Sequence, residues 1–405
     1  MNFEKKTKSI LYGMDFTHGI RRALIWALSL IYFVSLGFPI IWITTLFAVS
    51  TIIMVLFEFP TGAIADYDSR KKSLMISFFL MFIAFLGIFH FKEFWLIVPF
   101  WILGDIAWTF STGAGSAWVI DTLDIAKEKN KIASLFSKGA IFEKSGHIIG
   151  GLIGFFIITI SFRFIWLAIA LTNLTMFFII WKYMEERNFK PTKTPHNYAT
   201  KSIIKAKESF SYLIHSENLE LRILMIGGFL SAMAFSFFSI GMPLLLTQIL
   251  NFKPEYISGL FGLLSILALG APLIGEKMVH KKGFRKPLTG LLIMIGITMV
   301  IFGFSKTLIL AISALAILTI LETAIDVVED SAFQHTYTSE IRASLGSLNS
   351  INWAIANSIG VFLAGIAISF IGITNTTFLG GILVFLTSFI YLIGIGKEKN
   401  SHQNP

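Results

Sequence analysis

Ionisable side chains lie inside long apolar runs of this 405-residue chain, where a charge is costly to bury. In the first run Asp15, His18 and Arg22 follow i, i+3, i+7 spacing, which puts them on one face of a helix. An arginine on such a helix can bind a carboxylate or a phosphate. Asp15, His18, Arg21 and Arg22 are therefore candidate substrate-binding residues. If the span begins only at Ala23, both arginines lie instead at the membrane surface.

Acidic side chains interrupt three later apolar runs, where Glu143 pairs with His147 and Glu322 with Asp326 at i, i+4 spacing. Burial favours the neutral form of a carboxyl group, so such a group can change its charge during a transport cycle. Asp105 is the first candidate because its own helix has no arginine, although each of these groups could also form a static ion pair. The candidate proton-coupling residues are Asp105, Glu143, His147, Glu322 and Asp326.

Composition places these residues in a membrane protein. Hydrophobic residues make up 55% of the chain and charged residues only 14%, too few to cover the surface of a soluble fold. The chain has no cysteine and no phosphate-binding loop, HExxH or GxSxG motif. We therefore expect no enzyme, cofactor, metal site or ATP-driven pump. The net charge of +9 is explained by orientation in the membrane, without nucleic acid.

Apolar runs separated by polar breaks predict an all-α polytopic membrane protein with twelve spans. Basic residues gather in alternate connections, which predicts that both termini and the central polar segment are cytoplasmic. The expected spans are Ile10–Val34, Ile40–Ala63, Leu74–His90, Phe94–Val119, Phe136–Thr159, Phe162–Tyr183, Leu221–Leu246, Ile257–Ile274, Leu288–Phe304, Leu308–Val328, Leu345–Ile371 and Thr376–Ile395.

The spans divide into two sets of six. We expect an N-terminal half over 1–184, a cytoplasmic linker over 185–220 and a C-terminal half over 221–405. The loops after the second and eighth spans are both short and basic, beginning at Gly62 and Gly275. Equivalent loops at equivalent places favour an internal repeat.

The segment Gly62–Leu74 resembles the signature loop of the major facilitator superfamily, Gly-x-Leu-Ala-Asp-Arg-x-Gly-Arg-Lys. It matches at Gly62, Ala65, Asp66, Arg70 and Lys71, and departs at Tyr67 and Ser69. The preceding Glu-x-Pro-Thr-Gly resembles a drug-efflux-like bacterial branch. The resemblance implies the major facilitator fold and a loop that latches the outward-facing state, with Gly62 allowing close helix approach and Asp121 as an acidic partner. The expected latch residues are Gly62, Asp66, Arg70, Lys71 and Asp121.

The fifth span carries Gly146, Gly150 and Gly154, which resemble part of an antiporter motif and also form a smooth packing stripe. The sequence thus favours a secondary active transporter that exports small amphipathic compounds against protons. The alternatives are an uptake or exchange carrier for an anionic metabolite and a non-transporting receptor or assembly protein. The expected partners are a small-molecule substrate, protons and the lipid bilayer of the cell membrane, with the protein as a monomer.

Overall fold

The structure, a computed structural model, describes residues 3–125, 128–188, 219–336 and 342–394. A few helical side chains, including those of Asp66 and Tyr67, are also outside the description. The described residues form helices and no strand. These are α1 (Phe3–Ser35), α2 (Ile40–Tyr67), α3 (Arg70–His90), α4 (Phe94–Thr109), α5 (Ala114–Thr122), α6 (Lys129–Ile160), α7 (Phe164–Tyr183), α9 (Leu219–Leu244), α10 (Pro254–Leu267), α11 (Ala271–Lys282), α12 (Arg285–Gly303), α13 (Leu308–Thr336) and α14 (Arg342–Gly394).

Ten helical segments in the described part of the chain are long and apolar enough to cross a membrane. The last of them, Leu348–Leu392, contains Gly372 with φ of 79°, a break that separates the two C-terminal spans expected from sequence. Helix α1 is 33 residues long, and its charged residues keep it outside the ten. The all-helical membrane architecture agrees with the expected fold.

Two expected spans are interrupted helices. The run from Phe94 is divided into α4 and α5 around Gly113, whose φ of 73° suits glycine. A short 3₁₀ turn at Ala268–Gly270 separates α10 from α11. These breaks were not expected from hydropathy, because the runs stay apolar across them.

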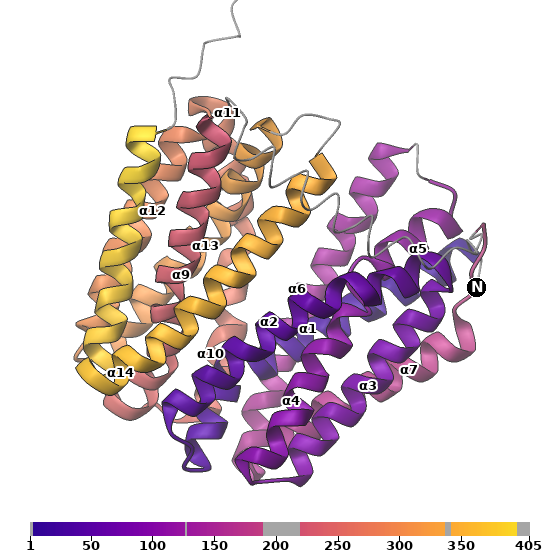
Figure 1. The fold of residues 1–405 in the computed structure, drawn as a ribbon, viewed down its shortest axis with the longest axis horizontal. Helices are drawn as coiled ribbons and strands as arrows, with labels where there is room; N and C mark the ends of the chain where they lie inside the picture. The colour runs from indigo at the N-terminus through magenta and orange to yellow at the C-terminus, as the bar shows by residue number, and fades with distance from the viewer. Residues whose placement is uncertain (1–2, 126–127, 189–218, 337–341, 395–405) are drawn as a thin grey trace, which may run out of the picture. The chain divides into compact units, whose positions relative to one another are not determined.

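The described chain forms two compact units. The N-terminal unit comprises Met1–Pro39, Val49–Ser202 and Lys253–Ser265, and the C-terminal unit comprises Ile40–Ala48, Ile203–Phe252 and Ile266–Pro405. Each unit therefore includes a short piece of a helix from the other half of the sequence. In the N-terminal unit α1 packs on α6, and α3 packs on α4 and α7; in the C-terminal unit α14 packs on α9 and α12 (Figure 1).

Glycines set the approach of α6 to α1. A Cβ on Gly150 would lie 2.9 Å from the Cβ of Ala23, and a Cβ on Gly146 would meet the Phe16 backbone. Only glycine therefore permits this packing, which agrees with the smooth stripe expected from sequence. Because α1 bears the polar face and α6 bears Glu143, this seam positions the site described below.

Candidate functional site

The signature loop joins α2 to α3 in the N-terminal unit. Ser69 caps α3, its hydroxyl accepting a hydrogen bond from the Lys72 amide at 3.0 Å. The Arg70 guanidinium forms an ion pair with Asp121 on α5. The Lys71 ammonium donates to the carbonyls of Trp181 and Met184, at 2.9 and 2.8 Å. These contacts therefore hold the N-terminal end of α3 against the C-terminal ends of α5 and α7.

Asp66 and Gly62, two of the expected latch residues, differ from the others in their outcome. The Asp66 side chain lies outside the described residues, so its expected role stays a prediction. Gly62 was expected to permit close helix approach. A Cβ built there would meet no described atom within 4 Å, so close packing does not explain glycine at this position in this structure.

Residues 184–188 complete the network, and sequence reasoning missed their role. Glu186 accepts hydrogen bonds from the Ser69 hydroxyl and from the Arg70 amide, the latter at 2.7 Å. Trp118 donates its indole N–H to the Glu185 carbonyl at 2.8 Å. Hydrogen bonds from Lys6 and then Arg187 hold the pKa of Glu185 below its usual value. The acidic pair directly after the sixth expected span was the available signal.

The polar face of α1 contacts aromatic rings. The His18 ring stacks on Phe78 at 5.5 Å between centroids and meets Trp108 edge-on at 4.7 Å. The Arg21 guanidinium lies 4.0 Å from the centre of the Trp108 ring, within cation–π range. His18 Nδ1 and Arg21 Nε are buried, with no hydrogen-bond partner among the described residues. These two donor-capable nitrogens suit a polar group of a ligand.

Arg22 and Asp15 have different surroundings. Arg22 forms an ion pair with Glu143 of α6 at 3.0 Å, and 63% of the Arg22 side chain is exposed. Asp15 lies against Gly139, one turn earlier on α6. The structure thus pairs Arg22 with Glu143 on another helix, not with a residue on its own helix face. His147 is partly buried one turn after Glu143.

Asp105 faces two partners from other helices. Its carboxylate interacts with the Ser50 hydroxyl and with the charge of Arg21. Ser50 also accepts a hydrogen bond from the Trp101 indole at 3.1 Å. The absence of an arginine on its own helix therefore does not leave Asp105 without a basic neighbour, since α1 supplies one.

The C-terminal unit contains an acidic cavity of about 280 Å³ between α9, α12, α13 and α14. Three carboxylates from α13 line it, Glu322, Asp326 and Glu329, spaced so that they share one helix face. Among the described residues that line the cavity there is no lysine, arginine or histidine. Glu329 was not among the candidate residues expected from sequence. The other lining residues are Gly228, Ser231, Ala232, Phe235, Leu292, Ile295, Ile325, Phe333, Asn349, Asn352, Trp353 and Val384.

Comparisons with known proteins agree with this architecture. Residues 11–361 match the family model of the Major Facilitator Superfamily. An uncharacterised MFS-type transporter of Bacillus subtilis (strain 168), YxaM, is 22% identical over 402 residues, covering 97% of each chain.

Solved structures share the fold at low sequence identity. The nucleoside transporter NupG is 13% identical with a TM-score of 0.75, covering 97% of this chain and 98% of that one. A D-xylose–proton symporter is 13% identical with a TM-score of 0.72, covering 98% of each. The human organic anion transporter MFSD10 is 14% identical with a TM-score of 0.66, covering 96% of this chain and all of that one. With the family model spanning most of its length, this chain belongs to the Major Facilitator Superfamily and is a multi-pass membrane transporter, not an enzyme.

Proposed function

We propose that this transporter exports small amphipathic compounds in exchange for protons, by alternating access of its two halves. The observation that carries this proposal is the acidic cavity of the C-terminal unit. A cavity of that size is close to the lower end of the range for small-molecule sites, roughly 300–1,000 Å³.

The lining of the cavity suits competition between a proton and an amphipathic substrate. Phe235 and Trp353 offer aromatic faces, and Asn349 and Asn352 offer amides. A positively charged or polar compound would contact the rings and the carboxylates of Glu322 and its neighbours. Protonation of those carboxylates removes their charge and weakens the attraction, which links proton uptake to substrate release.

Glu322 is a stronger candidate than Asp105 for the residue that binds the coupling proton. The charged group that acts on Glu322 is another carboxylate, Asp326, whereas Asp105 faces Arg21. A nearby arginine opposes proton binding by a carboxylate, and a like charge favours it. Glu143 forms an ion pair with Arg22, and because a nearby arginine opposes proton binding we assign Glu143 a structural role.

Inverted membrane vesicles with an acidic interior test the proposal. Wild-type protein should concentrate a lipophilic cation such as tetraphenylphosphonium inside them. Glu322→Gln should lose this gradient-driven accumulation but keep exchange of labelled for unlabelled cation at zero gradient. Asp330→Asn is the matched control on α13, because Asp330 does not line the cavity. Accumulation that survives in Glu322→Gln, or a loss confined to Asp105→Asn, would return the role to Asp105.

A second candidate function is uptake or exchange of an anionic metabolite. Arg21 supports it, because its guanidinium is held on Trp108 and its buried Nε has no described partner. Human MFSD10, whose structure is similar, is an organic anion transporter, which is consistent with this alternative. A thermal-shift screen of organic anions against lipophilic cations separates the two. Stabilisation by anions alone, lost in Arg21→Gln, would favour the anion carrier over the exporter.

A further inference from the structure

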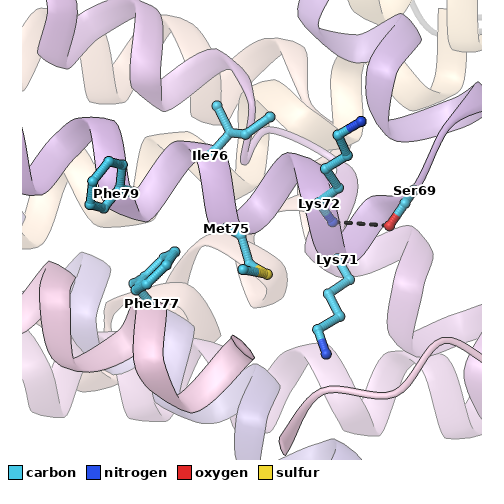
Figure 2. Close-up of a pocket in the computed structure, with 7 residues that line it drawn as sticks. All are labelled: Ser69, Lys71, Lys72, Met75, Ile76, Phe79 and Phe177. Atoms are coloured by element: carbon cyan, nitrogen blue, oxygen red, sulfur yellow. Dashed lines mark hydrogen bonds between the residues drawn. The ribbon is translucent and has the colours of Figure 1, made fainter. Parts of the chain in front are cut away.

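A groove of about 340 Å³ lies on the N-terminal unit where α3 begins and α7 ends (Figure 2). Its polar end is formed by Ser69, Lys71 and Lys72, and its remaining walls by Met75, Ile76, Phe79 and Phe177. The Phe79 ring on α3 and the Phe177 ring on α7 lie 5.3 Å apart, measured between their centroids. One side of the groove is thus cationic and the rest is hydrocarbon-like.

The groove lies at a membrane–water boundary. Helices α3 and α7 are both long and apolar enough to span the bilayer. Both lysines lie in the first turn of α3, and Lys71 donates hydrogen bonds to carbonyls at the end of α7. Exposed aromatic residues surround this end of α7, with Trp181 58% exposed and Tyr183 46% exposed. Aromatic residues of this kind are typical of the headgroup level. A ligand of this groove would therefore have one end among headgroups and the other among acyl chains.

The charges favour an anion at the polar end. Lys71 donates to two neutral carbonyls and has no carboxylate partner among the described residues. Lys72 is 59% exposed and pairs with Asp68, which is itself 53% exposed. Such an exposed pair contributes little and can exchange partners. Glu186, the other nearby carboxylate, is bonded to Ser69 and Arg70.

We propose that this groove binds an anionic phospholipid, with its phosphate at Lys71 and Lys72 and an acyl chain along Met75, Phe79 and Phe177. The lipid comes from the leaflet in which α3 begins. Each lysine near the headgroup should raise the affinity for an anionic lipid, relative to a zwitterionic lipid, by about five-fold. Because Lys71 also holds the end of α7 and its neighbour Arg70 holds Asp121, the lipid would rest directly against the signature loop.

Fluorescence quenching tests the proposal without any transport measurement. The chain has no native cysteine, so Ile76→Cys can be labelled with bimane at the groove, and Met294→Cys at an exposed position of α12. The protein is reconstituted with equal mole fractions of brominated phosphatidylglycerol or brominated phosphatidylcholine. At Ile76 the relative affinity obtained from quenching should be about five-fold or more higher for phosphatidylglycerol than for phosphatidylcholine. At Met294 the two lipids should quench equally.

Charge variants identify the residues responsible. K71Q/K72Q should abolish the preference at Ile76, whereas K71R/K72R should keep it. K281Q/K282Q, a second exposed lysine pair, is the matched control and should leave it unchanged. If K71Q/K72Q does not elute as a monodisperse protein, K72Q alone should still weaken the preference.

Three results obtained without added phosphate would overturn the proposal. These are equal quenching by both lipids at Ile76, a preference that persists in correctly folded K71Q/K72Q, and an equal preference at Met294. Added inorganic phosphate at constant ionic strength should not relieve the quenching. If it does, the site binds free phosphate and the lipid assignment fails.

Discussion

The glycine seam between α1 and α6 offers a prediction whose size follows from the structure. Replacing Gly150 by alanine would place a methyl group 2.9 Å from both the Ala23 Cβ and the Ile20 Cα. Ordinary contact begins at 3.4 Å, so the two helices must separate by about 0.5 Å. Overpacking of this kind typically costs about 1–3 kcal/mol. Gly146→Ala should cost at least as much, because the new methyl would meet the rigid backbone of Phe16.

A matched control comes from α12. Gly290 is also inside a helix, but a Cβ there would meet nothing within 4 Å in the described chain. Gly290→Ala should therefore be neutral or stabilising by up to about 1 kcal/mol, since alanine favours helix more than glycine does. The assay is the apparent melting temperature of detergent-purified protein at a fixed scan rate.

The expected order of apparent melting temperature is Gly290→Ala at or above wild type, then Gly150→Ala, with Gly146→Ala lowest or equal to it. Unchanged stability in both α6 variants would show that α1 and α6 are not held in this close contact. A similar loss in Gly290→Ala would show that the assay reports a general effect of glycine substitution.

Three further predictions concern the signature-loop network and the arginines. Arg70→Ala and Asp66→Asn should cut transport strongly while leaving membrane abundance near wild type; full transport by either would mean that the loop charges serve topology alone. Arg22→Cys should react quickly with a membrane-impermeant thiol reagent and Arg21→Cys slowly, because Arg22 is 63% exposed and Arg21 is packed on Trp108; equal rates would contradict this difference. Glu185→Gln should lower the apparent melting temperature at neutral pH, and the gap from wild type should shrink as pH falls below the usual glutamate value of 4.5. The sign follows because a lowered folded-state pKa stabilises only while the group is ionised, and a gap that widens in acid would refute it.

Much of the fold could be predicted from the sequence because a bilayer imposes simple rules on length and polarity. The apolar runs, the break near Gly372 and the glycine stripe on α6 all follow from local composition. The interruptions at Gly113 and Ala268 could not be found in the same way. Backbone conformation inside an apolar run is set by packing against neighbouring helices, which hydropathy does not record.

Part of the candidate site could also be predicted from the sequence, and part could not. Spacing placed His18 and Arg22 on one face of α1, and the family resemblance implied Asp121 as an acidic partner in the latch, which the structure pairs with Arg70. Contacts between helices distant in sequence were not accessible, such as Arg22 with Glu143 and Arg21 with Trp108. Asp105 has no arginine on its own helix, but the charge of Arg21 on α1 acts on it, and the sequence of a single helix does not reveal such a neighbour.

Different charges surround the buried carboxylates of the two units, and this difference distinguishes the role expected of Asp105 from the role proposed for Glu322. In the N-terminal unit the charge of Asp105 acts on Arg21, so Asp105→Asn removes the larger of the two attractive charges on that partly buried guanidinium. Loss of an attractive charge disfavours the charged form of a buried group and should therefore be destabilising. In the C-terminal unit Glu322 faces Asp326, so Glu322→Gln removes a repulsion between like charges. We therefore expect Asp105→Asn to lower the apparent melting temperature and Glu322→Gln to preserve or raise it, even though Glu322→Gln is the variant expected to lose proton-driven transport. The opposite order of stabilities would show that Asp105 is not balanced by Arg21, and would restore it as the residue that binds and releases the proton.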